Sequence, residues 1–243
     1  MVGFKNKQGN KKTIEVFHLI NFLHHLMVIS YKYKFIFIHT PKCAGSSIKR
    51  ALAPYGRINN KSPFTSIRKR LNIPNDAVSP YLSVFRTFTN HGKAVELQNE
   101  IPSKFWRSYF KFAFVRNPFD WVVSHYFYIL KDKNHPHHSE VAKCKNFKEY
   151  VKKEYYEHLT SRPNPQTSFL YDSNNNLLVD FVGKYELLNK DFRKICNKIG
   201  INAELPHINK STHVDYKNYY DRETIELVKA HCNMDLENFK YDS

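Results

Sequence analysis

The chain has 243 residues, 42% of them hydrophobic and 15% aromatic, so it can bury a core and is not expected to be disordered. Its 38 lysines and arginines outnumber 22 aspartates and glutamates, which gives a formal net charge of +16. Such a charge favours anionic ligands, including nucleotides, nucleic acid, sulfated polymers and acidic membranes, but it also describes a lysine-rich solvated surface. Charge alone therefore selects no single function.

The N-terminal segment is basic and then apolar. Several lysines precede an apolar run over residues 14–29, a pattern that superficially resembles a signal anchor. The run is short for a bilayer span and includes Glu15 and three histidines. We therefore expect an amphipathic helix or extension over residues 1–29 and one domain over residues 30–243. The four cysteines have no C-x-x-C spacing, which argues against a zinc site or disulfide framework and fits a reducing compartment. A cytoplasmic location is predicted, with membrane association through the N-terminal segment as the alternative.

The remaining elements alternate along the chain. Apolar runs rich in β-forming residues predict buried strands at 34–39, 110–115 and 177–182. Periodic apolar positions predict helices at 48–53, 93–101, 118–130, 146–158, 189–199 and 221–232. Loops and short helices are expected between 59 and 90. This alternation predicts an α/β fold with three α/β/α layers around a central parallel sheet.

The first motif with chemical content is the loop over residues 40–47, between the first predicted strand and its helix. Gly45 permits close approach of the backbone, Ser46 and Ser47 add hydroxyl donors at the helix start, and Lys42 adds a positive charge. This composition is typical of a P-loop-like phosphate-binding loop. It is not a Walker A motif, because the lysine precedes the glycine instead of following it.

The second motif begins where the second predicted strand ends. Arg116 is placed to grip a phosphate with its planar guanidinium, and Pro118 opens the next helix. Ser124 follows Arg116 by about two helical turns, so both side chains can reach one phosphate. An Arg-Asn-Pro tripeptide by itself would indicate only a turn, but the pair of motifs, each at a strand end, is far more specific.

Together the motifs resemble the paired binding motifs of sulfotransferases for 3′-phosphoadenosine 5′-phosphosulfate (PAPS). The likeness is greatest to membrane-type carbohydrate sulfotransferases and their bacterial relatives, and it continues through residues 178–186, 205–211 and 235–241. The resemblance implies a 5′-phosphosulfate loop, a 3′-phosphate pair and a C-terminal loop that closes over the nucleotide. The residues so implied are Lys42, Cys43, Ala44, Gly45, Ser46 and Ser47 for the first, Arg116 and Ser124 for the second, and Lys210 and Ser211 for the third.

The implied reaction transfers a sulfuryl group in line to a hydroxyl of a carbohydrate or glycoconjugate, with adenosine 3′,5′-bisphosphate (PAP) as the product. Lys42 is expected to stabilise the bridging oxygen of the leaving group. His91, which precedes a predicted helix, is the candidate general base, and His39, at the border of the phosphosulfate loop, is its rival. Protein cations can neutralise the sulfate, so no metal is required.

Two other functions explain part of the sequence. A nucleotide-dependent kinase would use a phosphate loop, but the Walker A order and an evident magnesium-binding Asp are missing. A basic nucleic-acid-binding protein would explain the charge but leaves both loops unexplained. The sulfotransferase resemblance therefore remains the leading interpretation, and it implies a carbohydrate acceptor. The positive charge would suit an anionic carbohydrate, and no nucleic-acid partner is expected.

Overall fold

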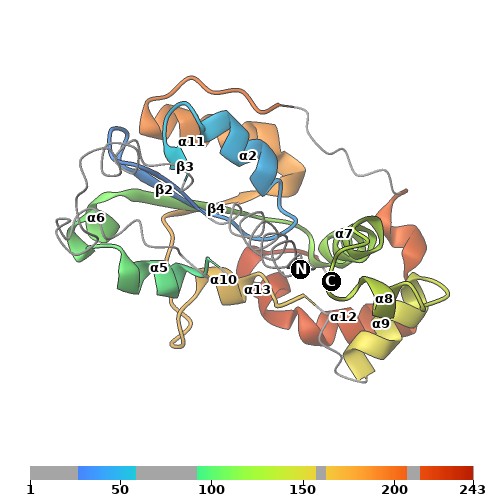
Figure 1. Ribbon diagram of the computed structural model, residues 1–243. Coiled ribbons are helices and arrows are strands. Elements are labelled where there is room, and N and C mark those ends of the chain that lie inside the picture. The colour runs from blue at the N-terminus through green and yellow to red at the C-terminus, as the bar shows by residue number, and fades with distance from the viewer. Residues whose placement is uncertain (1–26, 59–91, 157–162, 207–213, 243) are drawn as a thin grey trace, which may run out of the picture.

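The computed structural model describes residues 27–58, 92–156, 163–206 and 214–242. Within these residues one mixed sheet has the strand order β3-β1-β2-β4-β5 (Figure 1). The strands are β1 (Met27–Ser30), β2 (Phe35–Ile38), β3 (Arg57–Ile58), β4 (Phe110–Val115) and β5 (Phe181–Lys184). Strands β2, β4 and β5 are parallel, as predicted, whereas β1 pairs antiparallel with β2 and β3 and forms an edge that the sequence pattern did not indicate.

The three-layer architecture follows from the alternation of side chains along β2 and β4. Successive residues of a strand point to opposite faces, and here both faces are apolar and buried. One face carries Phe35, Phe37, Phe112 and Phe114. The other carries Ile36, Ile38, Ala113 and Val115. Because both faces must be removed from water, helices cover both, and the predicted fold class is confirmed.

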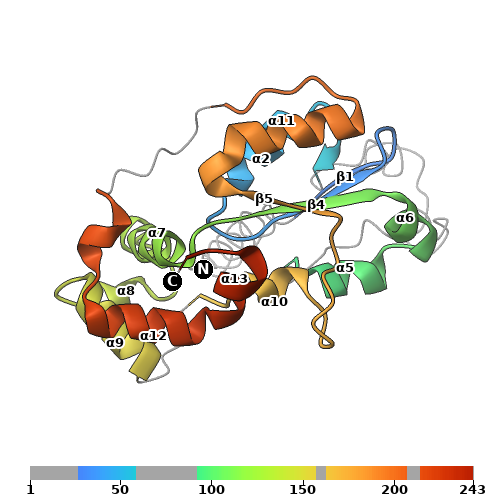
Figure 2. The ribbon, with the colours of Figure 1, turned by 180° about the vertical axis from the view of Figure 1, so that it is seen from behind.

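Helices α2 (Gly45–Leu52) and α11 (Leu188–Ile199) pack on the phenylalanine face. The opposite face is covered by α5 (Ala94–Glu100), α6 (Ser103–Ser108), α10 (Thr167–Leu170) and α13 (Asn233–Phe239). Figures 1 and 2 show these two layers above and below the sheet. The six helices predicted from periodicity are present with small shifts at their ends, and the unpredicted α6, α8, α10 and α13 are all short.

A third group of helices lies beyond the carboxyl ends of the parallel strands, beside the loop that follows β4 (Figures 1 and 2). It comprises α7 (Pro118–Lys131), α8 (His138–Val141), α9 (Phe147–Tyr156) and α12 (Arg222–His231). Two 3-10 turns, η1 (Tyr185–Leu187) and η2 (Tyr216–Tyr219), complete the described elements.

The third predicted strand, 177–182, was placed too early. Leu177 and Leu178 pair instead with residues 170–171, through a bridge to Tyr171 and a hydrogen bond from Leu178 N to Leu170 O. Pairing with β4 begins only at Phe181. A short apolar run does not reveal which neighbour its backbone will bond to, and this explains the shift.

The localisation predicted from the N-terminal segment, with its membrane alternative, was wrong. The end of the apolar run forms strand β1 instead of a helix, and its backbone pairs with β2. Across the described ranges, none of the helices has the length and apolarity needed to cross a bilayer. The remainder of the predicted extension, residues 1–26, lies outside the described residues.

Candidate active site

The loop between β2 and α2 has an unusual backbone. Lys42 and Ala44 adopt left-handed conformations, with φ angles of 63° and 61°, although neither is glycine. Such conformations cost free energy and persist where the surrounding structure enforces them, often at functional sites. The next residue is Gly45, and a side chain is excluded at this position because a Cβ would lie 1.8 Å from Cδ2 of the buried His39. Glycine is therefore needed here for an approach to an imidazole of the chain itself, and the predicted approach to an anion stays a prediction.

The loop leads into the first turn of α2, whose leading backbone N–H groups have no carbonyl four residues earlier in the helix. Cys43 and Ser47 are buried, whereas Ser46 is exposed. Thr40 Oγ1, also buried, has no hydrogen-bond partner among the described residues. A buried hydroxyl without a partner is uncommon, so this loop offers both backbone and side-chain groups to a ligand.

Lys42 is the cation of this loop. Its Nζ lies 4.1 Å from the centroid of the Tyr128 ring, a cation–π arrangement. Burial, and next the charge of Arg116, lower the pKa of Lys42 to about 8. Burial also raises the pKa of the Cys43 thiol well above its ordinary value, so Cys43 is a poor nucleophile in this environment.

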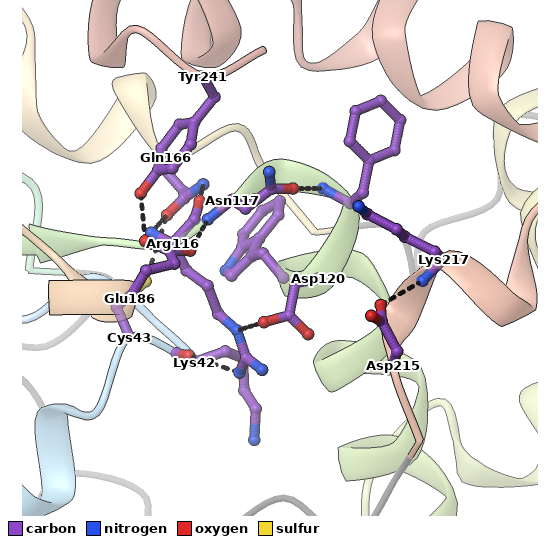
Figure 3. Close-up of polar contacts among 12 residues, drawn as sticks. Lys42, Cys43, Arg116, Asn117, Asp120, Gln166, Glu186, Asp215, Lys217 and Tyr241 are labelled. Atoms are coloured by element: carbon purple, nitrogen blue, oxygen red, sulfur yellow. Dashed lines mark hydrogen bonds and ion pairs between the residues drawn. The ribbon is translucent and has the colours of Figure 1, made fainter. Parts of the chain in front are cut away.

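Arg116 occupies the first position after β4 and is almost completely buried. Its Nε donates to Asp120 Oδ2 at 2.6 Å, and its guanidinium lies over the Tyr185 ring at 4.2 Å. Its Nη1 also donates to the carbonyl of Lys42 at 3.5 Å (Figure 3). This last contact joins the two predicted motifs, which are far apart in sequence and meet because β2 and β4 are adjacent parallel strands.

Helix α7 supports the loop from the side. The Trp121 indole Nε1 donates to the carbonyl of Pro41 at 2.8 Å, and Tyr128 lies beneath Lys42. Positions 121, 124 and 128 share one face of a helix, so Ser124, which is buried, faces the same loop. Arg116, at the end of β4, contacts this loop, and Ser124 lies on the same face of α7 as Trp121 and Tyr128, which also contact it.

Several predicted site residues lie outside the described residues, namely His91, Lys210 and Ser211. The rival base, His39, lies within the described residues. It is buried, packs against Gly45 and lies 6.2 Å from the Phe37 ring, measured between centroids. These contacts give His39 a role in shaping the loop.

Sequence reasoning missed the residues that hold the two motifs in place. Asp120 follows Arg116 by four positions, the helical ion-pair spacing, and could have been found by that signal. Gln166 accepts from Arg116 N at 2.8 Å and from the Cys43 thiol at 3.2 Å, yet nothing near it in the sequence indicates this role. Trp121 and Tyr128 were not singled out, because an aromatic residue in an apolar helix carries no signal of a contact with a loop.

The arrangement can bind an extended anion. A strained loop that carries a lysine leads into a helix start at one strand end, and an arginine lies at the end of the next strand. In open α/β sheets ligands bind outside the carboxyl ends of the strands, where all of these groups are found.

Comparison with known proteins agrees with this geometry. A protein from Archaeoglobus fulgidus, described only as uncharacterized, is 32% identical over 123 residues, which make up 50% of this chain and 93% of that protein. The model of the sulfotransferase family matches residues 25–242, which include β1 and extend almost to the C-terminus. The chain therefore belongs to the sulfotransferase family, whose members are transferases that move a sulfuryl group from a sulfate donor to an acceptor.

Proposed function

We propose that the donor is PAPS and that the chain transfers its sulfuryl group to a hydroxyl of a carbohydrate or glycoconjugate. The observation that carries this proposal is the contact from Arg116 Nη1 to the carbonyl of Lys42. This contact joins Arg116, the proposed 3′-phosphate residue, to the proposed 5′-phosphosulfate loop, and PAPS is a sulfuryl donor with anionic groups at both positions.

The 5′ side is assigned to Lys42 and to the loop and helix start from Cys43 to Ser47. The backbone N–H groups of Ala44, Gly45 and Ser46 would donate to the phosphosulfate oxygens. The buried Thr40 hydroxyl, which has no hydrogen-bond partner among the described residues, supports a ligand at close range. Lys42 would stabilise the negative charge that develops on the bridging oxygen as the bond from sulfur to that oxygen breaks.

The 3′ side is assigned to Arg116 and Ser124. A guanidinium carries five N–H donors, and contacts with the described residues engage Nε and Nη1. Donors therefore remain for a phosphate, and Asp120 and Tyr185 keep the guanidinium plane in a fixed orientation. Ser124 would add a hydroxyl from α7. Lys210 and Ser211 complete the proposed nucleotide site as a closing loop.

At the acceptor side, a base takes the proton of the hydroxyl as its oxygen bonds to sulfur, and PAP leaves with the electron pair of the broken bond. His91 remains our proposed base. The packing of His39 against Gly45 favours a structural role for the rival residue. The net charge of +16 supports an anionic saccharide as acceptor.

Calorimetric titration tests the donor assignment, with PAP, 5′-AMP and ATP as ligands. We expect PAP to bind the wild type at least about tenfold more tightly than 5′-AMP, because the 3′-phosphate gains charge-assisted hydrogen bonds. Arg116→Lys keeps the charge beside Asp120 but loses the planar fork, and should remove most of that preference. The matched control is Arg107→Lys, an exposed arginine that bonds only to Ser103 among the described residues and should leave the preference unchanged. Equal binding of ATP and PAP would favour a kinase and overturn the proposal.

The acceptor assignment is tested separately, by transfer of labelled sulfate from PAPS to a panel of saccharides, simple phenols and alkylamines. Incorporation into a saccharide hydroxyl that disappears in His91→Ala is expected. Sulfation of phenols with no saccharide product would contradict the carbohydrate assignment while leaving the donor assignment intact.

A further inference from the structure

Gln166 is a fully buried side chain between the two nucleotide motifs, just before α10. Its Oε1 accepts from the backbone N–H of Arg116 at 2.8 Å, and its Nε2 donates to the backbone carbonyl of Arg116 at 2.8 Å. A primary amide thus pairs with both main-chain groups of one residue, as a neighbouring strand would. The ladder between β4 and β5 ends at Val115, so Gln166 continues the pairing by one residue beyond the sheet.

The same amide reaches the other motif. The Cys43 thiol lies 3.2 Å from Gln166 Oε1 (Figure 3). It also lies 3.3 Å from the carbonyl of Pro41. Cys43 is buried and sits beside Lys42 in the phosphosulfate loop. One fully buried side chain therefore connects the end of β4 to the loop that follows β2.

Gln166 is itself braced by Asp235 of α13. Oδ2 of Asp235 accepts from the backbone N–H of Gln166 at 2.8 Å and lies 3.5 Å from its Nε2. Oδ1 accepts from the backbone N–H of Thr167 at 2.7 Å. Asp235 has no solvent exposure. A buried carboxylate that accepts backbone hydrogen bonds on both oxygens fixes the segment that carries Gln166, and so the amide has one orientation.

We propose that Gln166, braced by Asp235, is a positioning residue that sets the separation between Arg116 and the Lys42 loop and thereby selects nucleotides with anionic groups at both the 5′ and 3′ positions. This inference rests on the proposed function. A nucleotide spans the two subsites with a fixed distance between its phosphates. If the two subsites move independently, a ligand with both phosphates must fix their separation when it binds, and this ordering weakens its affinity. 5′-AMP contacts only one subsite and does not pay this cost.

The test compares the affinities of PAP and 5′-AMP in the wild type and in Gln166→Met, which keeps the length of the side chain but can form none of the amide's hydrogen bonds. We expect the ratio of the two affinities to fall by about tenfold, with 5′-AMP affinity changing little, since one buried hydrogen-bonding group accounts for about that factor. The matched control is Thr224→Val in α12. It removes a fully buried polar group whose hydroxyl bonds to Asp221, remote from the nucleotide motifs. It should lower the thermal midpoint without changing the ratio.

Cys43→Ala is a milder second variant, in case Gln166→Met does not fold. It removes the thiol contacts to Gln166 and to the Pro41 carbonyl but keeps the amide's hydrogen bonds to Arg116, and the ratio should fall by about twofold. An unchanged ratio in the folded Gln166 variant, or in Cys43→Ala if that variant alone folds, overturns the inference, as does an equal fall in Thr224→Val. The proposed function fails differently: the wild type itself would then not prefer PAP, and the selecting role of Gln166 would fall with it.

Discussion

The loops that follow β2 and β4 meet at one site but are held by opposite means. The β2 loop is shaped by its backbone, with left-handed residues at Lys42 and Ala44 and a contact of Gly45 with His39 that excludes a Cβ. The β4 loop is short, and no residue from 116 to 118 has a positive φ. Its shape comes from side chains: Asn117 caps α7 by accepting from Phe119 N, and Glu186 accepts from Asn117 N at 2.6 Å.

The difference suggests different sensitivities to substitution. A loop whose shape depends on its backbone should lose that shape when a Cβ is added at a position where it clashes, such as Gly45. The change should be confined to that loop. A loop that depends on partners should weaken when a distant residue changes, such as Tyr241, whose hydroxyl donates to Glu186 (Figure 3). Five predictions follow from these two loops, beginning with the largest expected effect.

Gly45→Ala should damage the β2 loop most. The added Cβ would lie 1.8 Å from Cδ2 and 1.9 Å from Nε2 of His39, which is buried and cannot swing into solvent. We expect the free energy of unfolding to fall by about 3 kcal/mol, as for overpacked cores, and nucleotide binding to be lost. Denaturant unfolding and PAP titration measure both.

The double variant Gly45→Ala/His39→Ala is the control for that prediction. If the clash with the imidazole is the cause, removing the ring should recover part of the lost stability, which appears as a coupling free energy in a double-mutant cycle. Additive losses would show that the clash is not the source.

Asp120→Asn should weaken the β4 loop. It removes the carboxylate charge that pairs with the buried Arg116 guanidinium, and a charge-assisted hydrogen bond of this kind contributes about 2 kcal/mol to the free energy of unfolding. Glu149→Gln is the matched control, because Glu149 pairs with Lys153 at the same i,i+4 spacing but on the surface. Similar stability losses in the two variants would contradict the assigned importance of burial.

The charge of Lys42 should make nucleotide binding sensitive to pH. Since burial and Arg116 lower the pKa of Lys42 to about 8, PAP affinity should fall as the pH rises through that value and the ammonium charge is lost. Lys42→Met should bind PAP more weakly at neutral pH and lack this step. If the affinity of Lys42→Met for PAP falls by the same factor over this pH range, the pH dependence belongs to another titratable group.

The same shift has the opposite effect on stability. Between about 8 and the ordinary value of 10.5, the unfolded chain keeps the Lys42 proton and the folded chain releases it. The contribution of Lys42 to the free energy of unfolding therefore rises with pH across that interval. Unfolding experiments on wild type and Lys42→Met, compared across the interval, isolate this contribution.

The smallest effect is expected for Tyr128, which is 41% exposed. Tyr128→Leu removes the ring beneath Lys42 and should cost about 0.5 kcal/mol, the value of an exposed cation–π contact. Tyr128→Phe keeps the ring and should match the wild type. Loss of stability in the phenylalanine variant would assign the effect to the hydroxyl instead.

Much of the site could be predicted because its residues are local to recognisable patterns. The apolar runs at 35–38 and 110–115 predict strands in any context where both faces are buried, and the order Lys42, Gly45, Ser46 indicates a loop that binds phosphate. The third strand was misplaced and the edge strand β1 was missed, because each depends on which segment supplies the hydrogen-bonding partner.

The sequence by itself determined the fold class, the positions of the two candidate nucleotide loops and the sulfotransferase resemblance, since each depends on residues close together along the chain. Only the tertiary structure decided how the loops are held. Gln166 lies 50 residues from Arg116 and 69 from Asp235, and Glu186 lies 69 residues from Asn117. No local pattern announces a buried amide or carboxylate at such separations. The hydrogen-bond partner of such a group depends on how the sheet and the C-terminal helices pack. A buried polar group must form hydrogen bonds, and the packing determines which groups lie next to it.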